Sequence, residues 1–175
     1  MSFFRGPQFP ELMVDIETLS TRPDAAIISI AAVFFNVDTK QFATPAFYAE
    51  VDHETLTAFH TDPDTVAWWA KQTQPMPHGT TPLTIALKDL IAFIQGNPPA
   101  RIWARSPSFD LVILKEACKK LDLAWPIPFW QERDVRTLID VAKLPKNGLP
   151  THNAIEDCLS QIRAVTDSFN AILLK

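Results

Sequence analysis

The strongest constraint on the fold is a nearly unbroken apolar stretch, IISIAAVFFNV, from Ile27 to Val37. Runs of this length that are rich in β-branched and aromatic residues are typical of a central strand covered on both faces. A shorter apolar segment, LMVDIETL at residues 12–19, precedes it, and a third strand-like segment follows from Phe47 to Val51. We expect these three segments to pair as an antiparallel meander.

The rest of the sequence alternates between helical and strand-like patterns. Apolar residues between Leu83 and Gln95 recur every three or four positions, as in an amphipathic helix. Ser106-Pro107 is a favourable helix start, because proline suits the first helical position. Expected helices span residues 62–72, 83–95, 106–123, 136–144 and 153 to near the end, and further strands span 101–105 and 132–135. This order predicts an α/β fold with a mixed five-stranded sheet and helices on both faces.

Length and composition exclude several classes of protein. The 175 residues fit one domain, 1–175, with an N-terminal arm at 1–11. No apolar window of about 18 residues predicts a transmembrane helix. The N-terminus lacks the pattern of a secretion signal, which makes the cytoplasm the expected location. Cys118 and Cys158 lie among apolar neighbours and are expected to be reduced core thiols. The few glycines form no phosphate-binding loop, which argues against nucleoside triphosphate chemistry.

Two acids of the first predicted strand, Asp15 and Glu17, are two positions apart. Side chains at i and i+2 of a strand point to the same face, so an apolar strand places these carboxylates side by side. Like charges this close repel each other, and a bound cation relieves the repulsion. The pair therefore indicates a metal site. The alternative is a solvated sheet edge, where water screens both charges.

Two further acids are expected near helix N-termini. Asn153 and Glu156 form a capping-box pattern, which places His152 just before a helix and Asp157 at its fourth position. An imidazole and a carboxylate are close together in that arrangement. Asp110 falls in the first turn of the helix that Ser106-Pro107 predicts. For either acid, compensation of the helix dipole is an alternative explanation.

The order of these motifs along the chain is more specific than any one of them. Asp-x-Glu-Thr on a first strand, Ser-x-Phe-Asp at a strand-to-helix junction and His-x4-Asp at a late helix resemble the DEDDh exonucleases, a branch of the ribonuclease H-like superfamily. The residues that carry the resemblance are Asp15, Glu17, Asp110, His152 and Asp157. Longer segments resemble a subgroup of standalone exonucleases that includes the exodeoxyribonuclease VIII and DexA types and a small exoribonuclease group. These segments are residues 14–35, 65–72, 109–114, 133–138 and 151–158.

This resemblance implies a ribonuclease H-like fold and a metal-dependent 3′→5′ exonuclease. Such an enzyme releases 5′-mononucleotides from the 3′ end of single-stranded DNA or RNA, and the subgroup slightly favours DNA. In the family pattern, two Mg²⁺ or Mn²⁺ ions share Asp15, while Glu17 and Asp157 complete one ion's shell and Asp110 holds the other. Oxygen ligands suit these ions, and a pair about 4 Å apart stabilises the attacking and leaving oxygens. His152 would be the general base, since histidine titrates near neutral pH. Some relatives are dimers, so a homodimer is a candidate assembly.

The resemblance also suggests residues that contact the substrate. Thr18 and Leu19 occupy the corner that meets the terminal nucleotide, although an ordinary strand end explains them equally well. Trp68 and Trp69 are adjacent and cannot share one helix face, so one is expected in the core and the other, with Trp68 as the candidate, is free to stack on a base. Simple packing of both is the alternative.

One segment departs from the family pattern. Relatives commonly have Gly-Asn-Gly where this chain has Ala104-Arg105-Ser106. Arg105 replaces an asparagine near the terminal nucleotide, and an arginine there can bind a phosphate instead. Ser108 is a further candidate for a substrate contact.

A catalytically inactive nucleic-acid-binding module of the same fold is the alternative function. An eroded site would have lost some of the motif residues, whereas all are present. A generic α/β enzyme with other metal chemistry would not require their order. The net charge of −4 is unusual for a nucleic-acid-binding protein. A carboxylate site accounts for it locally, because bound cations reverse the sign of the potential.

Overall fold

A computed structural model describes residues 8–145 and 150–173. Its strands are β1 (Glu11–Thr18), β2 (Ile27–Asn36), β3 (Gln41–Phe42), β4 (Phe47–Glu50), β5 (Arg101–Ala104) and β6 (Glu132–Asp134). Its helices are α1 (Pro63–Trp69), α2 (Leu83–Gly96), α3 (Asp110–Lys120), α4 (Val135–Ala142) and α5 (Ala154–Leu173), with 3₁₀ helices at η1 (His53–Leu56) and η2 (Phe129–Gln131). None of the helices in the described ranges has the length and apolarity needed to cross a bilayer.

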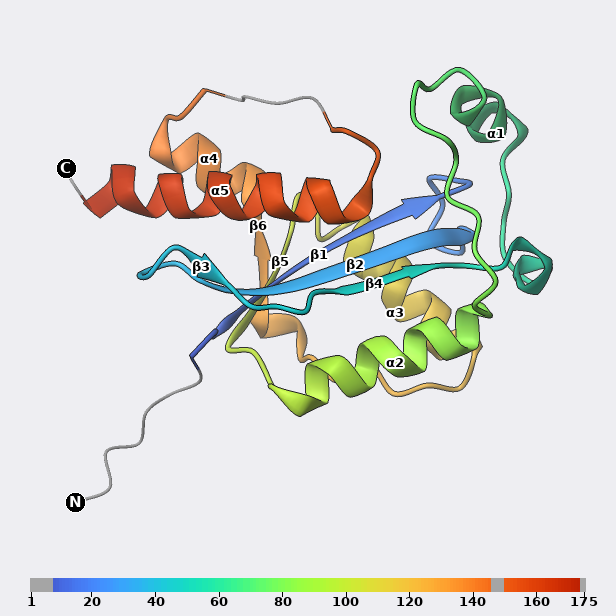
Figure 1. The fold of residues 1–175 in the computed structure, drawn as a ribbon, viewed down its shortest axis with the longest axis horizontal. Helices are drawn as coiled ribbons and strands as arrows, with labels where there is room; N and C mark the ends of the chain where they lie inside the picture. Colours follow the sequence, from blue (N-terminus) through green and yellow to red (C-terminus); the bar gives the residue numbers. More distant parts are fainter. Residues whose placement is uncertain (1–7, 146–149, 174–175) are drawn as a thin grey trace.

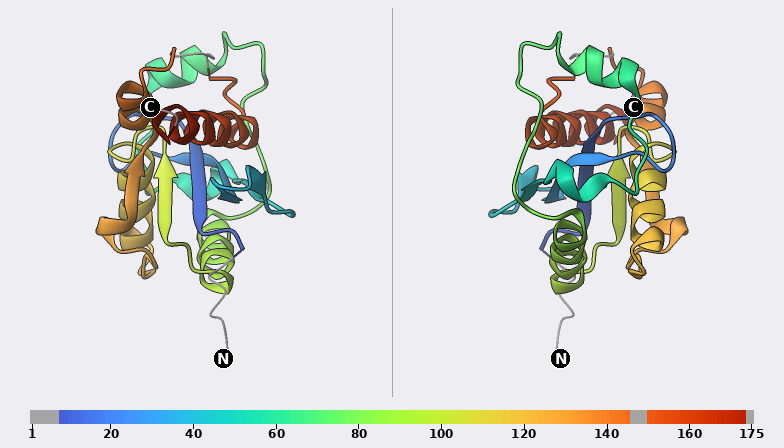
Figure 2. Two further views of the ribbon diagram at one scale, coloured as in Figure 1. Left: turned by 90° about the vertical axis from the view of Figure 1, so that its left-hand side faces the viewer. Right: turned by 90° about the vertical axis from the view of Figure 1, so that its right-hand side faces the viewer.

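The strands form one mixed sheet with helices on both faces. Its order is β3-β2-β1-β5-β6, with β4 also paired to β2. The meander of β1, β2 and β4 is antiparallel, whereas β5 and β6 run parallel to β1. Helices α4 and α5 lie over one face, and α2 and α3 lie over the other (Figures 1 and 2). This arrangement confirms the predicted α/β fold, a mixed sheet with helices on both faces.

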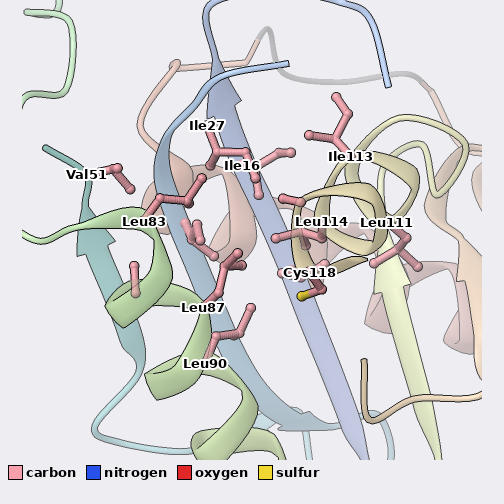
Figure 3. Packing of buried hydrophobic residues seen from close by; sticks show 14 of the residues in the cluster. Ile16, Ile27, Val51, Leu83, Leu87, Leu90, Leu111, Ile113, Leu114 and Cys118 are labelled. Atoms are coloured by element: carbon pink, nitrogen blue, oxygen red, sulfur yellow. The ribbon is translucent and has the colours of Figure 1, made fainter. Parts of the chain in front are cut away.

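Strand β1 is buried along its whole length, and its alternate side chains enter two different cores. Leu12, Val14 and Ile16 pack with α2 and α3, as Figure 3 shows for Ile16 beside Leu83, Leu87 and Leu114. Met13, one position out of phase, packs against α5. Each fully buried leucine or isoleucine contributes roughly 1.5–3 kcal/mol, so the register of β1 is firmly fixed. The same alternation places the side chains of Asp15 and Glu17 on the α5 face.

The second core joins α5 to the sheet. Cys158, Ile162 and Val165 of α5 are buried against β1 and β2, and the Cys158 thiol lies 3.7 Å from the Ala31 carbonyl oxygen. Both cysteines are free and buried, as expected from their apolar neighbours. Packing along one stripe of α5 fixes which residues of its first turns face β1.

Some predicted boundaries are wrong. The Asn36 Oδ1 accepts hydrogen bonds from the amides of Asp38 and Thr39 and closes a tight turn directly after β2, which frees the residues that follow Lys40 to pair with β2. The freed residues form β3, so the sheet has six strands where five were expected. The N-terminal arm predicted for residues 1–11 lies mostly outside the described residues, and Glu11 already belongs to β1.

The start of α3 also differs from its prediction. The Ser106 carbonyl oxygen accepts hydrogen bonds from the amides of Phe109 and Asp110, which makes residues 107–109 a tight turn. Helix α3 therefore begins at Asp110, and Phe109 rather than Ser106 is its N-cap. Asp110 nevertheless stays in the first turn of the helix, as predicted.

Candidate active site

Three of the predicted acids converge between β1 and α5. Asp15 and Glu17 are each 9% exposed, and Asp157 in the first turns of α5 is 6% exposed. One carboxylate oxygen from each of the three lies within 4.8 Å of the others. Small residues, Ala31 and Ser29, lie opposite the pair on β2. Three oxygen donors this close suit a hard divalent cation.

Burial makes the carboxylates of Asp15 and Glu17 hard to ionise in the absence of a cation. Desolvation raises the pKa of Asp15 well above its usual value, and the charges of Asp110 and Glu17 raise it further. Desolvation likewise raises the pKa of Glu17 to about 8, with contributions from Asp157 and Asp110. The metal-free cluster therefore holds protons near neutral pH. A divalent cation that replaces those protons relieves the same repulsion.

Asp110 approaches the cluster from the opposite side, at the N-terminus of α3. It is 5% exposed, and burial raises its pKa to about 7 against the lowering effects of backbone groups and of the Arg136 charge. It does not belong to the compact group formed by Asp15, Glu17 and Asp157. Its charge still acts on Asp15 and Glu17, so all four acids share one electrostatic environment.

His152 is held in an unusual turn at the start of α5. Its φ angle is 58°, in the left-handed region that few residues other than glycine adopt. Both oxygens of the Asp157 carboxylate stabilise this turn: one accepts the Thr151 amide at 2.8 Å and the other accepts the His152 amide at 3.1 Å. The Asn153 Oδ1 accepts the Glu156 amide at 3.2 Å, as the capping-box pattern predicted. Asp157 therefore joins the candidate base to the acidic cluster.

The five motif residues line one open cleft of about 460 Å³, which we call the acidic cleft. Two arginines, Arg105 and Arg136, also line it. The remaining wall comes from Ile16, Ser106, Phe109 and Pro150. The side chains predicted from three separate motifs thus share one solvent-accessible space.

A second pocket of about 420 Å³, the α1 pocket, adjoins the acidic cleft along Ile16, Glu17 and Phe109. Thr18, Trp68 and Trp69 belong to its wall. Trp69 is 3% exposed and its indole N–H donates to the Thr18 carbonyl oxygen at 3.0 Å, so this tryptophan is the core member of the pair. Trp68 is 39% exposed.

The Trp68 ring contacts the candidate base. Its centroid lies 4.6 Å from that of the His152 ring, and the two planes are nearly perpendicular at 87°. Trp68 was expected either to stack on a base or to pack in the core, and neither expectation included this contact. Two predicted substrate residues lie apart from both pockets: Leu19 is only 6% exposed in the core, and the Ser108 hydroxyl pairs with that of Ser106 at 3.2 Å.

Gln161 was missed by sequence reasoning. Its side-chain amide donates to the Asp15 Oδ1 at 2.7 Å, and the residue is 5% exposed. A local signal was available, because Gln161 lies four positions after Asp157 on α5 and residues at that spacing share a helix face. Arg136 and Arg133 flank Asp134, and Arg136 lines the acidic cleft. Arg133 instead donates to the backbone carbonyl oxygens of Trp130 and Glu132.

Comparisons with known proteins agree with this geometry. Residues 10–169 match the family model of the 3′-5′ exoribonuclease Rv2179c-like domain. The fold is similar to that of the nuclease domain of 3′hExo, a DEDDh family member solved with rAMP, with a TM-score of 0.59 and 12% identity over 97% of this chain and 94% of that one. A 3′-exonuclease structure concerned with recognition of the histone mRNA stem-loop gives a TM-score of 0.54 at 12% identity, over 95% of this chain and 82% of that one. A search of curated proteins finds no match. The chain therefore belongs to the Rv2179c-like 3′-5′ exoribonuclease domain family and is a 3′-5′ exonuclease with the fold of the DEDDh nucleases.

Proposed function

We propose that this chain shortens single-stranded nucleic acid from its 3′ end and releases 5′-mononucleotides. One observation carries the proposal: Asp15, Glu17, Asp110, His152 and Asp157, which are far apart in sequence, line the same cleft. In this assignment the four carboxylates hold divalent cations and His152 is the general base. An inactive binding module of the same fold would not need these five groups together.

The donor set fits Mg²⁺ or Mn²⁺. It consists of carboxylate oxygens, which these hard cations prefer, and it offers no thiolate. We propose two ions that share Asp15, with Glu17 and Asp157 completing one shell and Asp110 holding the other. When bound, the cations neutralise phosphate charge and stabilise the attacking and leaving oxygens. The separation of Asp110 from the compact group of three acids is in keeping with a second ion position.

The residues of the chain then bind, orient and move protons. We assign the terminal nucleoside to the α1 pocket, beside Thr18 and Trp68, and the scissile phosphate to the acidic cleft beside Arg105. His152 takes a proton from the attacking water on an imidazole nitrogen. Asp157 keeps that imidazole in place through the turn that it caps, and the Trp68 ring limits its rotation on one side.

The type of nucleic acid is a separate part of the proposal. The sequence resemblance to the exodeoxyribonuclease VIII and DexA subgroup favoured DNA slightly, whereas the matching family is described as exoribonuclease. We propose RNA as the first substrate to test and DNA as the second. A single domain, a homodimer and a cytoplasmic location stay predictions from the sequence.

The test is digestion of matched RNA and DNA strands that carry a 5′ label. With Mg²⁺ or Mn²⁺, the wild-type protein should shorten at least one of them from its 3′ end and release 5′-mononucleotides. Asp15→Ala should abolish this activity without unfolding the protein. Asp89→Ala, which removes an exposed carboxylate on α2, is the matched control and should be fully active. Binding of the strands without metal-dependent shortening of either would establish the inactive-module alternative.

A further inference from the structure

A third cavity lies between α4 and α5, next to the acidic cleft. We call it the α4–α5 cavity; its volume is about 130 Å³. Its apolar wall is formed by Val135 and Ile139 of α4 and by Ala164 of α5. This volume is several times the roughly 30 Å³ that a water molecule occupies in the liquid, so the cavity has room for a planar ring.

The α4–α5 cavity is connected to the acidic cleft through two cationic side chains. Arg105 and Arg136 line both spaces. The α1 pocket, by contrast, shares no lining residue with the α4–α5 cavity and meets the cleft along Glu17 and Phe109. The acidic cleft therefore has a separate cavity on each of two sides.

Gln161 lines the α4–α5 cavity and, within the described ranges, carries one polar atom without a partner. Its amide nitrogen donates to the Asp15 Oδ1 at 2.7 Å. Its Oε1 is buried and has no hydrogen-bond partner among the described residues. Buried acceptors are almost always satisfied in native proteins, so an N–H or O–H donor from a ligand is the expected complement.

The two arginines are similarly available. Within the described residues, no hydrogen bond or ion pair occupies the guanidinium of Arg105 or Arg136, whereas Arg133 on the neighbouring strand is satisfied by backbone carbonyls. The charge of Arg136 acts on Asp110 and opposes the rise that burial causes in the Asp110 pKa. Guanidinium groups that face such a cleft suit phosphate oxygens, which they can bind with two parallel hydrogen bonds.

We propose that the α4–α5 cavity is a subsite for the nucleoside on the 5′ side of the scissile phosphate. This inference rests on the proposed function. The base lies between Val135, Ile139 and Ala164, a donor of the nucleoside satisfies Gln161, and the arginines bind the adjoining phosphates. The strand then runs in the 5′→3′ direction from the α4–α5 cavity, through the acidic cleft, to the α1 pocket. Because Gln161 also donates a hydrogen bond to Asp15, occupation of this subsite changes the surroundings of a proposed metal ligand.

The test uses strands with one abasic residue at the penultimate, the terminal or the fourth position from the 3′ end. Removal of the penultimate base should raise KM about tenfold, the size of effect expected when one stacked or buried base is lost. Removal of the fourth base should change KM less than twofold. Equal effects at the penultimate and fourth positions would overturn the subsite.

Two cavity-filling variants locate the effect. Ala164→Met fills the cavity from α5, and Ser160→Trp blocks it from an exposed position on the same wall, where folding is not at risk. Either should raise KM for the unmodified strand about tenfold and have no further effect on the strand that lacks its penultimate base. Ala171→Met, on the same helix outside the cavity, is the matched control. Additive losses from the variant and the abasic residue would contradict the proposal.

Binding separates failure of the subsite from failure of the proposed activity. Anisotropy of a 5′-fluorescein strand, measured with Ca²⁺ as the cation, reports occupation without requiring hydrolysis. Ala164→Met should weaken this binding, and Arg136→Gln should reduce the slope of log affinity against log salt by about 0.7, as expected for one phosphate contact on a single strand. If Ala164→Met binds the strand more weakly than the wild-type protein does, and the wild-type protein never shortens the strand, the subsite is upheld and the exonuclease assignment is rejected. Unchanged binding in both variants would reject the subsite alone.

Discussion

Without metal, the protein should lose stability as pH rises from about 5.5 to 8, and Glu17 should account for much of the loss. Burial raises the pKa of Glu17 from 4.5 to about 8, and the charges of Asp157 and Asp110 add to the rise. Between these two values the folded protein keeps a proton that the unfolded chain has released. Because the folded state then binds more protons, its stability falls with rising pH and is greatest in mild acid.

The size of the effect follows from the pKa difference. A rise from 4.5 to about 8 is worth about 5 kcal/mol once Glu17 is fully ionised, since each pH unit corresponds to about 1.4 kcal/mol. Over the interval from about pH 5.5 to 8 the expected loss is about 3 kcal/mol, or roughly 6–12 °C in melting temperature for a domain of this length. The raised pKa values of Asp15 and Asp110 act in the same direction, but the coupled carboxylates share protons and their contributions do not add.

Thermal unfolding followed by circular dichroism in EDTA measures this directly. The wild-type melting temperature should fall across the pH range, and Glu17→Gln should lose most of that slope. Glu54→Gln, at an exposed position of η1, should keep the wild-type slope. Saturating Mg²⁺ should stabilise the protein most at the alkaline end, where the cluster is least protonated. A metal-free melting temperature that stays level or rises with pH would refute the electrostatic account of the cluster.

Three further substitutions probe the surroundings of the site. Gln161→Leu removes the amide that donates to Asp15, a proposed metal ligand, and should raise the Mg²⁺ concentration for half-maximal activity about tenfold or more; an unchanged Mg²⁺ titration would show that this bond is only structural. Trp68→Ala should lower kcat about two- to tenfold, because it removes the ring contact with His152. Trp68→Phe should keep a nearly wild-type kcat. A change in KM alone would instead assign Trp68 to stacking on a base. Glu11→Gln breaks the ion pair with Arg101 at the far end of β1. It should lower the free energy of unfolding in denaturant by about 2 kcal/mol, less than for a fully buried pair, because Arg101 is partly exposed. A reduced kcat in the folded variant would contradict a purely structural role.

The parts of the site that depend on local periodicity could be predicted from the sequence. Alternation along β1 predicted that Asp15 and Glu17 share a face, and the capping pattern at Asn153 predicted the start of α5. Local spacing also kept Asp110 in the first turn of α3 although the helix begins later than expected. These features follow from backbone geometry within a few residues, which is why they are visible in a single sequence.

The contacts that local spacing did not reveal join distant segments. Gln161 and Asp15 are separated by 146 positions, and Trp68 meets His152 only because α1 lies beyond the end of β1 (Figure 1). Trp69 rather than Trp68 lies in the core, where its indole N–H donates to the Thr18 carbonyl oxygen at the corner between β1 and β2. Such pairings depend on how helices pack over the sheet, and propensity and periodicity do not determine that packing.

The net charge of the protein is −4. This charge is compatible with binding a polyanion when cations occupy the acidic site. The three-acid group offers phosphate no positive charge until cations occupy it, so we expect cation binding and strand binding to favour each other. Arg105 and Arg136 line the same cleft, where we expect them to attract the strand at short range without making the whole surface basic. A protein that relied on general basicity would bind nucleic acid in the absence of metal. For this chain we instead expect tight binding of the strand only when the ions that also support hydrolysis are present.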